Sequence, residues 1–362
     1  MTLLIATDEA GYGPRLGPLV IVATAWRLSP QWDISTADCM LREPLHIDNV
    51  GKFHIDDSKR IFKRPKAKAG EPTSASSIDR ITDAVAHWVG LPVPSIDTAN
   101  WLRSVATDDF GSLVKQPWFK TLAAKRSLTR TTTAGSTADP ITEALIRHWS
   151  RGGWQLVSIA ARIIDAASFN AMLDRSGNKA DLLSDSTCGL AIKLANRIYE
   201  TSDRSVIIQS DRFGGRAYYA GLVQHHCPQY NVQVTAQSSQ SSSYRLTDST
   251  EPTRSIQPTP HASNRHGAKT KERPTTIDWS FTVGGDSFPP VAMSSIIAKS
   301  TRERLMDLLN RYFQTETASD PKLGKNLKPT AGYTVDANRF LCDISAYRVA
   351  AGIDDQILIR KK

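Results

Sequence analysis

Short apolar runs that end in polar, glycine-containing turns recur along the chain. Residues 3–7 are apolar and β-prone, and residues 16–26 form a second such run beyond a turn. This order predicts a β-hairpin whose first strand ends at Asp8 and Glu9. The same pattern predicts further strands at residues 154–164, 205–210 and 279–283.

Apolar residues at helical spacing predict three helical regions. Residues 182–199 and 294–313 are each expected to form one long helix, and residues 72–150 a series of helical stretches interrupted by prolines. The helix at 294–313 is expected to be amphipathic, with an outward, solvated side. That side carries four basic residues, Lys299, Arg302, Arg304 and Arg311.

Two segments lack a pattern of buried positions and are predicted to be loops. Residues 56–68 are polar and charged, which is typical of an exposed loop. Residues 235–276 are basic and rich in Ser, Thr, Gln and Pro, with very little apolar content. Such a composition predicts a flexible, solvated loop, because it offers too little apolar surface to bury.

The charge balance favours a polyanionic partner. The 362 residues include 45 Lys and Arg against 36 Asp and Glu, which gives a formal charge of +9. A basic balance of this kind is common in proteins that bind nucleic acid, although a plain basic surface is an equally good explanation at this point. With 40% hydrophobic residues, the chain has enough apolar material for one large domain or two ordinary ones.

Neither a membrane segment nor a secretory signal is predicted. The longest apolar run, around residues 19–26, has a strand's length and is far shorter than the roughly 20 residues of a membrane-spanning helix. The four cysteines, Cys39, Cys188, Cys227 and Cys342, form no C-x-x-C pair, which argues against structural zinc and against a disulfide framework. We therefore expect a cytoplasmic protein that is not associated with a membrane, with reduced, mostly structural cysteines.

Three predicted strands end in a carboxylate. Asp8 and Glu9 follow the first strand, Asp211 follows a buried run, and Asp286 follows a strand and two glycines. Any one of these acids alone is best explained as a cap or turn former. Their joint occurrence after three strands favours a shared site. Two other acids near apolar segments, Asp165 and Asp185, are interpreted as helix-start caps.

Carboxylates gathered at strand ends repel one another and stay ionised together only beside cations. Mg²⁺ is the natural choice, because it prefers oxygen ligands and is often completed by substrate phosphates. Two such ions about 3.5–4 Å apart can promote hydrolysis of a phosphodiester. The pattern thus predicts metal-dependent chemistry on a nucleic acid.

Five blocks along the chain resemble the type 2 ribonuclease H family. The run from Asp8, Asp-Glu-Ala-Gly-Tyr-Gly-Pro-Arg-Leu-Gly-Pro-Leu-Val, is similar to the family's opening D-E-A-G-R-G-P-x-x-G-P-V-V. Asp57-Ser58-Lys59 resembles its D-S-K element, and Asp211 stands where the family has an aspartate at the end of a strand. The later blocks are Gly285-Asp286 with residues 291–302, similar to G-D followed by A-A-S-I-I-A-K-V-T-R-D, and Gly332-Tyr333-Thr334, similar to G-Y-x-T.

The resemblance implies an α/β, ribonuclease H-like fold with a mixed central sheet flanked by helices. Residues 1–60 and 150–345 would form the catalytic core, 61–149 a largely helical insertion, 235–276 the flexible basic loop within the core, and 346–362 a C-terminal tail. The insertion and the loop are absent from ordinary family members, so the chain is a divergent one.

The resemblance also assigns roles. Four acids would be the catalytic residues and would bind two Mg²⁺ or Mn²⁺ ions: Asp8, Glu9, Asp211 and Asp286. Lys59 and Lys299 would bind phosphates. Backbone groups around Gly11, Tyr12 and Gly13, together with the Tyr333 ring, would recognise the 2′-hydroxyl and the neighbouring sugar.

Two departures from the family pattern concern the substrate. Tyr12 replaces the arginine of G-R-G, so that a ring capable of stacking stands where the family has a guanidinium. After Tyr333 the family usually has a histidine, whereas this chain has Asp336 and Asn338. Because every carboxylate position is filled, these departures bear on substrate choice more than on metal binding.

The sequence therefore predicts a monomeric endoribonuclease that cleaves RNA in RNA–DNA hybrids, or ribonucleotides embedded in duplex DNA. Two alternatives stay open at this point. The chain could be a non-catalytic nucleic-acid-binding protein that keeps the fold, or a two-metal nuclease with another substrate such as a DNA junction.

Overall fold

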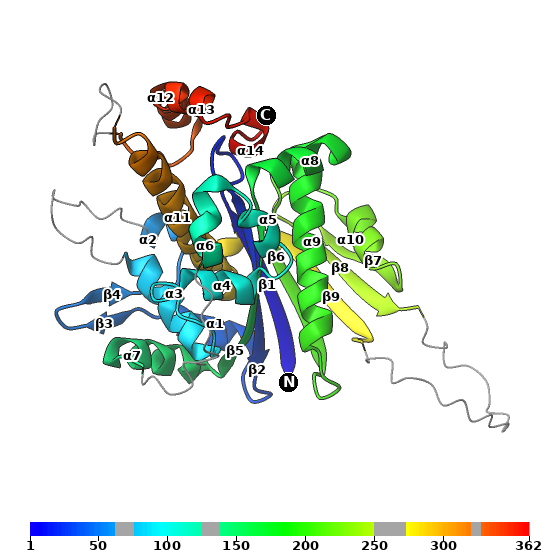
Figure 1. The fold of residues 1–362 in the computed structure, drawn as a ribbon. Coiled ribbons are helices and arrows are strands. Elements are labelled where there is room, and N and C mark those ends of the chain that lie inside the picture. Colours follow the sequence, from blue (N-terminus) through cyan, green and yellow to red (C-terminus); the bar gives the residue numbers. More distant parts are fainter. Residues whose placement is uncertain (62–75, 125–137, 250–272, 320–326, 362) are drawn as a thin grey trace, which may run out of the picture.

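A seven-stranded mixed sheet forms the centre of the molecule (Figure 1), in a computed structural model that describes residues 1–61, 76–124, 138–249, 273–319 and 327–361. The strand order is β5-β2-β1-β6-β9-β8-β7. The strands are β1 (Thr2–Ala10), β2 (Leu19–Leu28), β5 (Trp154–Ile164), β6 (Ser205–Asp211), β7 (Tyr230–Gln237), β8 (Ser241–Asp248) and β9 (Thr276–Thr282).

The direction of the strands decides where the site lies. β1 and β2 form the predicted antiparallel hairpin, whereas β6 runs parallel to β1, and β9 runs parallel to β6. The carboxyl ends of β1, β6 and β9 therefore meet at one edge of the sheet. The predicted α/β class, with a mixed sheet flanked by helices, is confirmed.

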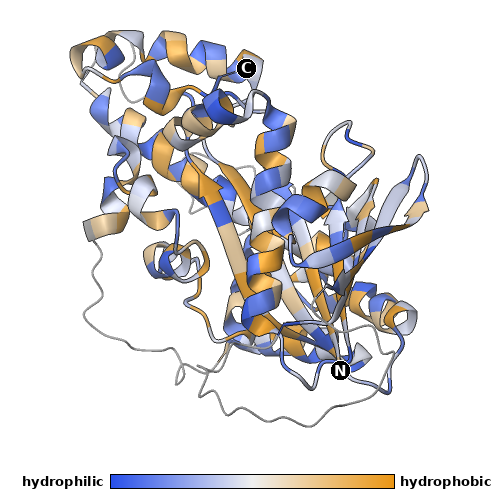
Figure 2. Cartoon of the chain, turned by 90° about the vertical axis from the view of Figure 1, so that its right-hand side faces the viewer, coloured by the Kyte–Doolittle hydropathy of each residue, from blue (hydrophilic) through white to orange (hydrophobic). Residues whose placement is uncertain are grey.

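One loop prediction is wrong. Within 235–276, residues 235–237 belong to β7, residues 241–248 form β8, and β9 begins at Thr276, while residues 250–272 lie outside the described part. β8 buries alternate side chains, Ser242, Tyr244, Leu246 and Asp248, and exposes Arg245 and Thr247 between them. The strand was missed because only two large apolar residues, Tyr244 and Leu246, show the alternation. Figure 2 shows the apolar central strands beside the more polar β7–β8 hairpin.

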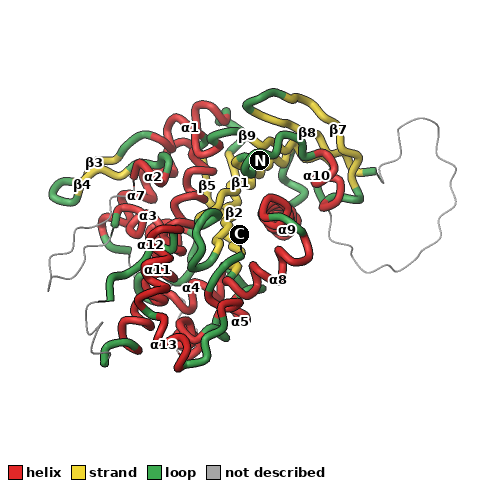
Figure 3. Tube along the Cα trace, turned by 90° about the horizontal axis from the view of Figure 1, so that it is seen from above, coloured by secondary structure: helices red, strands yellow, loops and turns green. Residues whose placement is uncertain are grey.

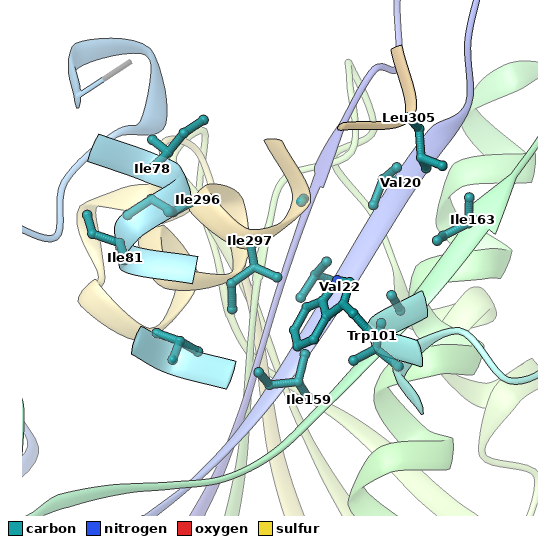
Figure 4. Packing of buried hydrophobic residues seen from close by; sticks show 14 of the residues in the cluster. Val20, Val22, Ile78, Ile81, Trp101, Ile159, Ile163, Ile296, Ile297 and Leu305 are labelled. Carbon is teal, nitrogen blue, oxygen red and sulfur yellow. The ribbon is translucent and has the colours of Figure 1, made fainter. Parts of the chain in front are cut away.

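One face of the sheet packs on the long helix α11 (Pro289–Glu316), and the other on α9 (Lys179–Ile198), as the view from above shows (Figure 3). Ile297 of α11 and Val22 of β2 belong to the first buried cluster (Figure 4). Ile5 and Leu194 belong to the second. Alternate residues of β1 and β2 thus face opposite layers, as the period of a strand requires.

Many apolar side chains in the described part of 61–149 are buried in the same hydrophobic cluster as side chains of the sheet. Ile78, Ile81 and Trp101 lie in contact distance of the α11 layer and the strands (Figure 4). Their burial means that this segment packs directly on the sheet. The division of the chain into a core and an insertion stays a prediction.

The segment 56–68, predicted as an exposed loop, contains the short helix α2 (Ser58–Ile61), and residues 62–68 lie outside the described part. Ser58 and Ile61 are buried. The remaining elements of the chain are α1 (Ile34–Arg42), β3 (Leu45–Ile47), β4 (Gly51–Phe53), α3 (Ser77–Trp88), α4 (Thr98–Val105), α5 (Phe110–Leu113), η1 (Pro117–Phe119), α6 (Lys120–Ala124), α7 (Pro140–Trp149), η2 (Ser150–Gly152), α8 (Ala166–Ser176), α10 (Ala220–His226), η3 (Gly285–Ser287), α12 (Thr334–Asp343), α13 (Ser345–Ala350) and α14 (Asp355–Leu358).

Several smaller predictions can also be judged. Asp165 caps α8, where its carboxylate accepts from Ser168 N–H, as predicted. Asp185 is not a cap, because it lies inside α9, where it pairs with His226 at 2.9 Å. All four cysteines are free thiols, although Cys39 and Cys342 are exposed rather than structural. In the described part of the chain, no helix combines the length and the apolar content that a membrane crossing needs.

Candidate functional site

Three carboxylates lie at the edge where β1 and β6 end. Thr7 of β1 pairs with Ser210 of β6, so Asp8 and Asp211 follow at the next position of two adjacent parallel strands. Side chains at matched positions of adjacent strands lie on the same face of a sheet. Glu9 follows Asp8 at the end of β1. We call Asp8, Glu9, Asp211 and Asp286 the acidic edge.

Asp286 reaches the same edge through a turn after β9. Asp211 pairs with Thr282 at the end of β9, and η3 contains Gly285 and Asp286. The Gly285 N–H donates a 2.8 Å hydrogen bond to a carboxylate oxygen of Asp211. Asp286 therefore directly follows, in the chain, a residue that contacts Asp211.

The electrostatics of Asp8 show that these acids interact. Burial raises the pKa of Asp8 well above its usual value, and the charges of Glu9 and Asp211 raise it further. Hydrogen bonds from the Ser295 hydroxyl and the Glu9 N–H oppose this rise. Like charges that raise a neighbour's pKa must lie close to it, so three of the four predicted acids share one electrostatic environment.

Serines of α11 attach this helix to the acidic edge. The Ser294 hydroxyl donates to the Ala6 carbonyl of β1 at 3.0 Å. Its neighbour Ser295 bonds to Asp8 and lies 3.0 Å from the hydroxyl of Ser58. The Asp57-Ser58-Lys59 element therefore meets Asp8 through Ser295. Lys59 lies in α2, and its side chain falls outside the described part of the structure.

The acidic edge suits a hard divalent cation by its chemistry. Its ligands would all be carboxylate oxygens, which Mg²⁺ and Mn²⁺ accept, and a cation would relieve the repulsion that raises the pKa of Asp8. Among the described residues, no group of three or more His, Cys, Asp or Glu side chains is arranged to hold a metal ion. The structure thus brings the acids to one edge without closing them into a ligand set.

The loop after β1 wraps around a buried arginine of α11. Arg302 is only 3% exposed, and its guanidinium donates to the carbonyls of Leu16 and Ala331 at 3.3 and 3.0 Å. A Cβ at Gly11 would lie 2.4 Å from Arg302 Nε, so the loop needs glycine there. The prediction that Arg302 faces solvent is therefore wrong. Helical periodicity could not show that two loops cover this turn of α11.

The other basic residues of α11 lie elsewhere. Arg304 pairs with Asp79 and Asp83 of α3 at 3.2 and 3.5 Å, whereas Arg311 is exposed as predicted. Lys299 is partly exposed and lies 3.8 Å from Glu303, one turn along the helix.

The late Gly-Tyr block lies beside the loop after β1. The Gly332 carbonyl accepts the N–H groups of Arg15 and Leu16 at 2.8 and 3.2 Å. Tyr333 is 54% exposed, and its ring centroid lies 5.9 Å from the Arg302 guanidinium carbon. Residues more than 300 positions apart thus form one surface.

Asp336 and Asn338, which follow Tyr333 where the family usually has a histidine, hydrogen-bond to the loops around the site. Asp336 accepts hydrogen bonds from the Thr330 hydroxyl and the Ala331 N–H at 2.7 and 2.8 Å. Asn338 accepts a hydrogen bond from the Arg15 guanidinium. Both residues therefore orient backbone and side chains around the site.

Tyr12 covers the loop from the side of α9. Its ring packs against the buried cluster of that layer, and its hydroxyl lies within 4.0 Å of the position a Cβ would take at Gly214. Burial raises the pKa of Tyr12, and the charge of Glu9 adds to this effect. Tyr12 therefore lies between the acidic edge and the turn after Asp211. Gly13 is exposed, and among the described residues no atom lies within 4 Å of the position that a Cβ would take there.

Sequence reasoning missed Ser295 and Arg360. Ser295 lies within the block of residues 291–302, and its contact with Asp8 arises only because α11 crosses β1. Arg360 lies in the predicted C-terminal tail, which is packed in place: its side chain is 1% exposed and contacts the loop after β1. No local pattern distinguishes it from the two lysines that follow.

A comparison with protein-family models gives no match, and none is found among curated proteins either. Several solved structures are similar to the chain, among them the following three. Each is aligned over 99% of this chain: RNase HII in its PCNA complex from Archaeoglobus fulgidus (12% identity, TM-score 0.39, 94% of that chain), Bst-RNase HIII in complex with Mn²⁺ (14%, 0.40, 66%) and ribonuclease H2 from Pyrococcus horikoshii OT3 (12%, 0.38, 92%). TM-scores of this size do not define a family, so the assignment of the site rests on its own residues.

Proposed function

We propose that this chain is a metal-dependent endoribonuclease of the type 2 ribonuclease H kind. Its substrates would be RNA in RNA–DNA hybrids and ribonucleotides embedded in duplex DNA. The observation that carries the proposal is the acidic edge, where two adjacent parallel strands end near Asp8, Glu9 and Asp211, and where burial and then the charges of Glu9 and Asp211 raise the pKa of Asp8. Such repulsion is costly unless a cation is bound there.

Asp8, Glu9, Asp211 and Asp286 would hold two Mg²⁺ or Mn²⁺ ions. When bound, such ions supply an activated water and stabilise the departing oxygen of a phosphodiester. Hydrolysis breaks the bond between phosphorus and O3′, and the products carry 5′-phosphate and 3′-hydroxyl ends. Ser295 supports this role because it orients the Asp8 carboxylate.

The surface beside the acidic edge would bind the substrate. Lys59 and Lys299 would contact phosphates, and the net charge of +9 favours a polyanion. The backbone of Gly11–Gly13 would read the 2′-hydroxyl, which is the chemical difference between RNA and DNA. The exposed ring of Tyr333, held beside that loop through Gly332, would contact the neighbouring sugar, and Tyr12 offers a second ring for stacking.

A strand-cleavage assay tests the proposal. Matched duplexes carry zero, one or four ribonucleotides, and each is incubated with the full chain in Mg²⁺ or in Mn²⁺. We expect cleavage only where ribonucleotides are present, with 5′-phosphate ends. Asp211→Asn should abolish cleavage and still bind the hybrid, whereas Asp185→Asn, which changes an acid paired with His226 away from the edge, should cleave normally.

Three other outcomes would contradict the proposal. Full Mg²⁺-dependent activity of Asp211→Asn would exclude the acidic edge as the catalytic site. Binding of the hybrid in chelator with no cut strand after addition of metal would favour a non-catalytic binding protein. Equal cleavage of the all-deoxyribonucleotide duplex would favour a two-metal nuclease with another substrate.

A further inference from the structure

The C-terminal segment inserts an arginine beneath the loop that follows β1. The two terminal nitrogens of Arg360 donate to the carbonyl oxygens of Gly11 and Tyr12, each at 2.5 Å. The side chain is 1% exposed, so it cannot itself reach a bound nucleic acid. Figure 1 shows α14 and the C-terminus beside the end of β1.

Contacts from α8 hold this segment in place. The Arg360 guanidinium carbon lies 4.1 Å from the centre of the Phe169 ring. The Asn170 amide donates to the carbonyls of Gln356 and Ile359 at 2.9 and 2.8 Å, and its oxygen accepts Lys361 N–H at 2.8 Å. Asn170 therefore fixes the backbone on both sides of Arg360 without touching the loop after β1.

The segment also pairs with the loop through its backbone. Leu16 and Ile359 form an isolated antiparallel bridge. The Arg360 N–H donates to the Arg15 carbonyl at 2.9 Å. The loop is thus held from one side by Gly332 and from the other by residues 359–360.

The two hydrogen bonds to Arg360 set the direction of two peptide planes. In a trans peptide, the C=O of one residue and the N–H of the next point in opposite directions, and the described chain has no cis peptide. The Gly11 and Tyr12 carbonyls point at Arg360, so the N–H groups of Tyr12 and Gly13 point away from it. Within the described part of the chain, neither N–H has a hydrogen-bond acceptor.

Arg360 is poorly explained as a stabilising residue. Burial, and then the positive charge of Arg302, lower the pKa of Arg360 to about 9. Holding this charge in the interior therefore costs free energy, and a buried charge can often be replaced by an apolar side chain at little net cost. The gain is the fixed geometry of the loop.

We propose that Arg360 is a positioning residue, which aims the N–H groups of Tyr12 and Gly13 outward as donors for the sugar of a ribonucleotide. The C-terminal segment, residues 359–361, then acts as a latch on the loop after β1. This inference rests on the proposed function. It assigns to a buried residue near the end of the chain the control of discrimination between ribose and deoxyribose.

The test compares Arg360→Met and Asn170→Ala with the matched control Lys361→Met in the full chain. Lys361 lies next to Arg360, but its side chain pairs with Asp174 on the surface. Affinity in Ca²⁺ is measured for two duplexes that differ by one ribonucleotide. We expect Arg360→Met and Asn170→Ala to reduce the ratio of the two affinities about tenfold, and Lys361→Met to leave it unchanged.

Amide hydrogen exchange provides a second readout that requires no substrate. The N–H groups of Arg15 and Leu16, which bond to Gly332, should exchange about tenfold faster in Arg360→Met and Asn170→Ala. Amides of β6 should exchange as in the wild type, which shows that the variants fold. Asn170→Ala removes no contact with the loop, so the same loosening there supports the latch.

Each outcome decides a separate point. Wild-type exchange at Arg15 and Leu16 in Arg360→Met would overturn the latch. Faster exchange with an unchanged affinity ratio would overturn the positioning role. A wild-type chain with no preference for the ribonucleotide would overturn the proposed function and the positioning role together, while the exchange data would still decide whether the latch exists.

Discussion

The backbone of Gly285 lies directly against Asp211. Its N–H donates a 2.8 Å hydrogen bond to the Asp211 carboxylate, and a Cβ at Gly285 would lie 2.8 Å from the Asp211 α-carbon. This close approach joins the turn that carries Asp286 to the end of β6. The acidic edge therefore depends on a glycine that has no chemical role of its own.

Gly285→Ala should separate β6 from the turn after β9. Because the added methyl would meet backbone atoms, we expect a loss of about 1–3 kcal/mol in the free energy of unfolding and a large loss of cleavage activity. Gly215→Ala is the control, since nothing lies within 4 Å of the Cβ position there. Urea unfolding and the strand-cleavage assay measure both effects. Wild-type stability of Gly285→Ala would contradict the observed packing.

Gly11→Ala and Gly13→Ala should behave differently although both change the same loop. Gly11 has a φ of +86°, and a Cβ there would meet Arg302. We expect Gly11→Ala to cost about 1–3 kcal/mol, from backbone strain and from displacement of a buried side chain. Gly13→Ala has open space and should unfold like the wild type. Equal unfolding midpoints for the two variants would show that Arg302 does not pack under Gly11.

The contribution of Asp8 to the stability of the metal-free protein should fall as pH rises. The folded state raises the pKa of Asp8 above 3.8, chiefly by burial and then through Glu9 and Asp211. Between 3.8 and the raised pKa, the folded state keeps a proton that the unfolded state has released, so the free energy of unfolding decreases with pH. Asp8→Asn should reduce this slope and be more stable than the wild type at pH 7 in chelator. Thermal unfolding across pH measures it, and a destabilised Asp8→Asn at neutral pH would contradict the expectation.

Divalent ions should stabilise the wild type but not the acidic-edge variants. An ion that binds only the folded state adds about 2.7 kcal/mol to its stability when its free concentration is about 100 times Kd. We expect Mn²⁺ and Mg²⁺ to raise the unfolding temperature of the wild type and of Asp185→Asn, and to have little effect on Asp211→Asn. Thermal unfolding at graded ion concentrations checks this. An equal rise in all three proteins would place ion binding elsewhere.

Local patterns predicted the strands that carry the acids. The runs that end at Asp8 and Asp211 became β1 and β6, because buried apolar β-prone residues leave few alternatives. The long helices α9 and α11 were predicted for the same reason. β8 was missed because only two of its buried positions, Tyr244 and Leu246, are large apolar residues, so its pattern is weak. The roles of the site residues stay predictions.

The sequence by itself determined which residues are acidic, which strands precede them, and which short blocks accompany the acids. These properties depend on neighbouring residues only. The tertiary structure decided that β1 and β6 run parallel in matched register, that Arg302 is covered, and that Arg360 holds the loop at Gly11 and Tyr12. Each of these relations joins segments far apart in the chain. Burial and hydrogen bonding across such distances arise from packing, which no local pattern of residues encodes.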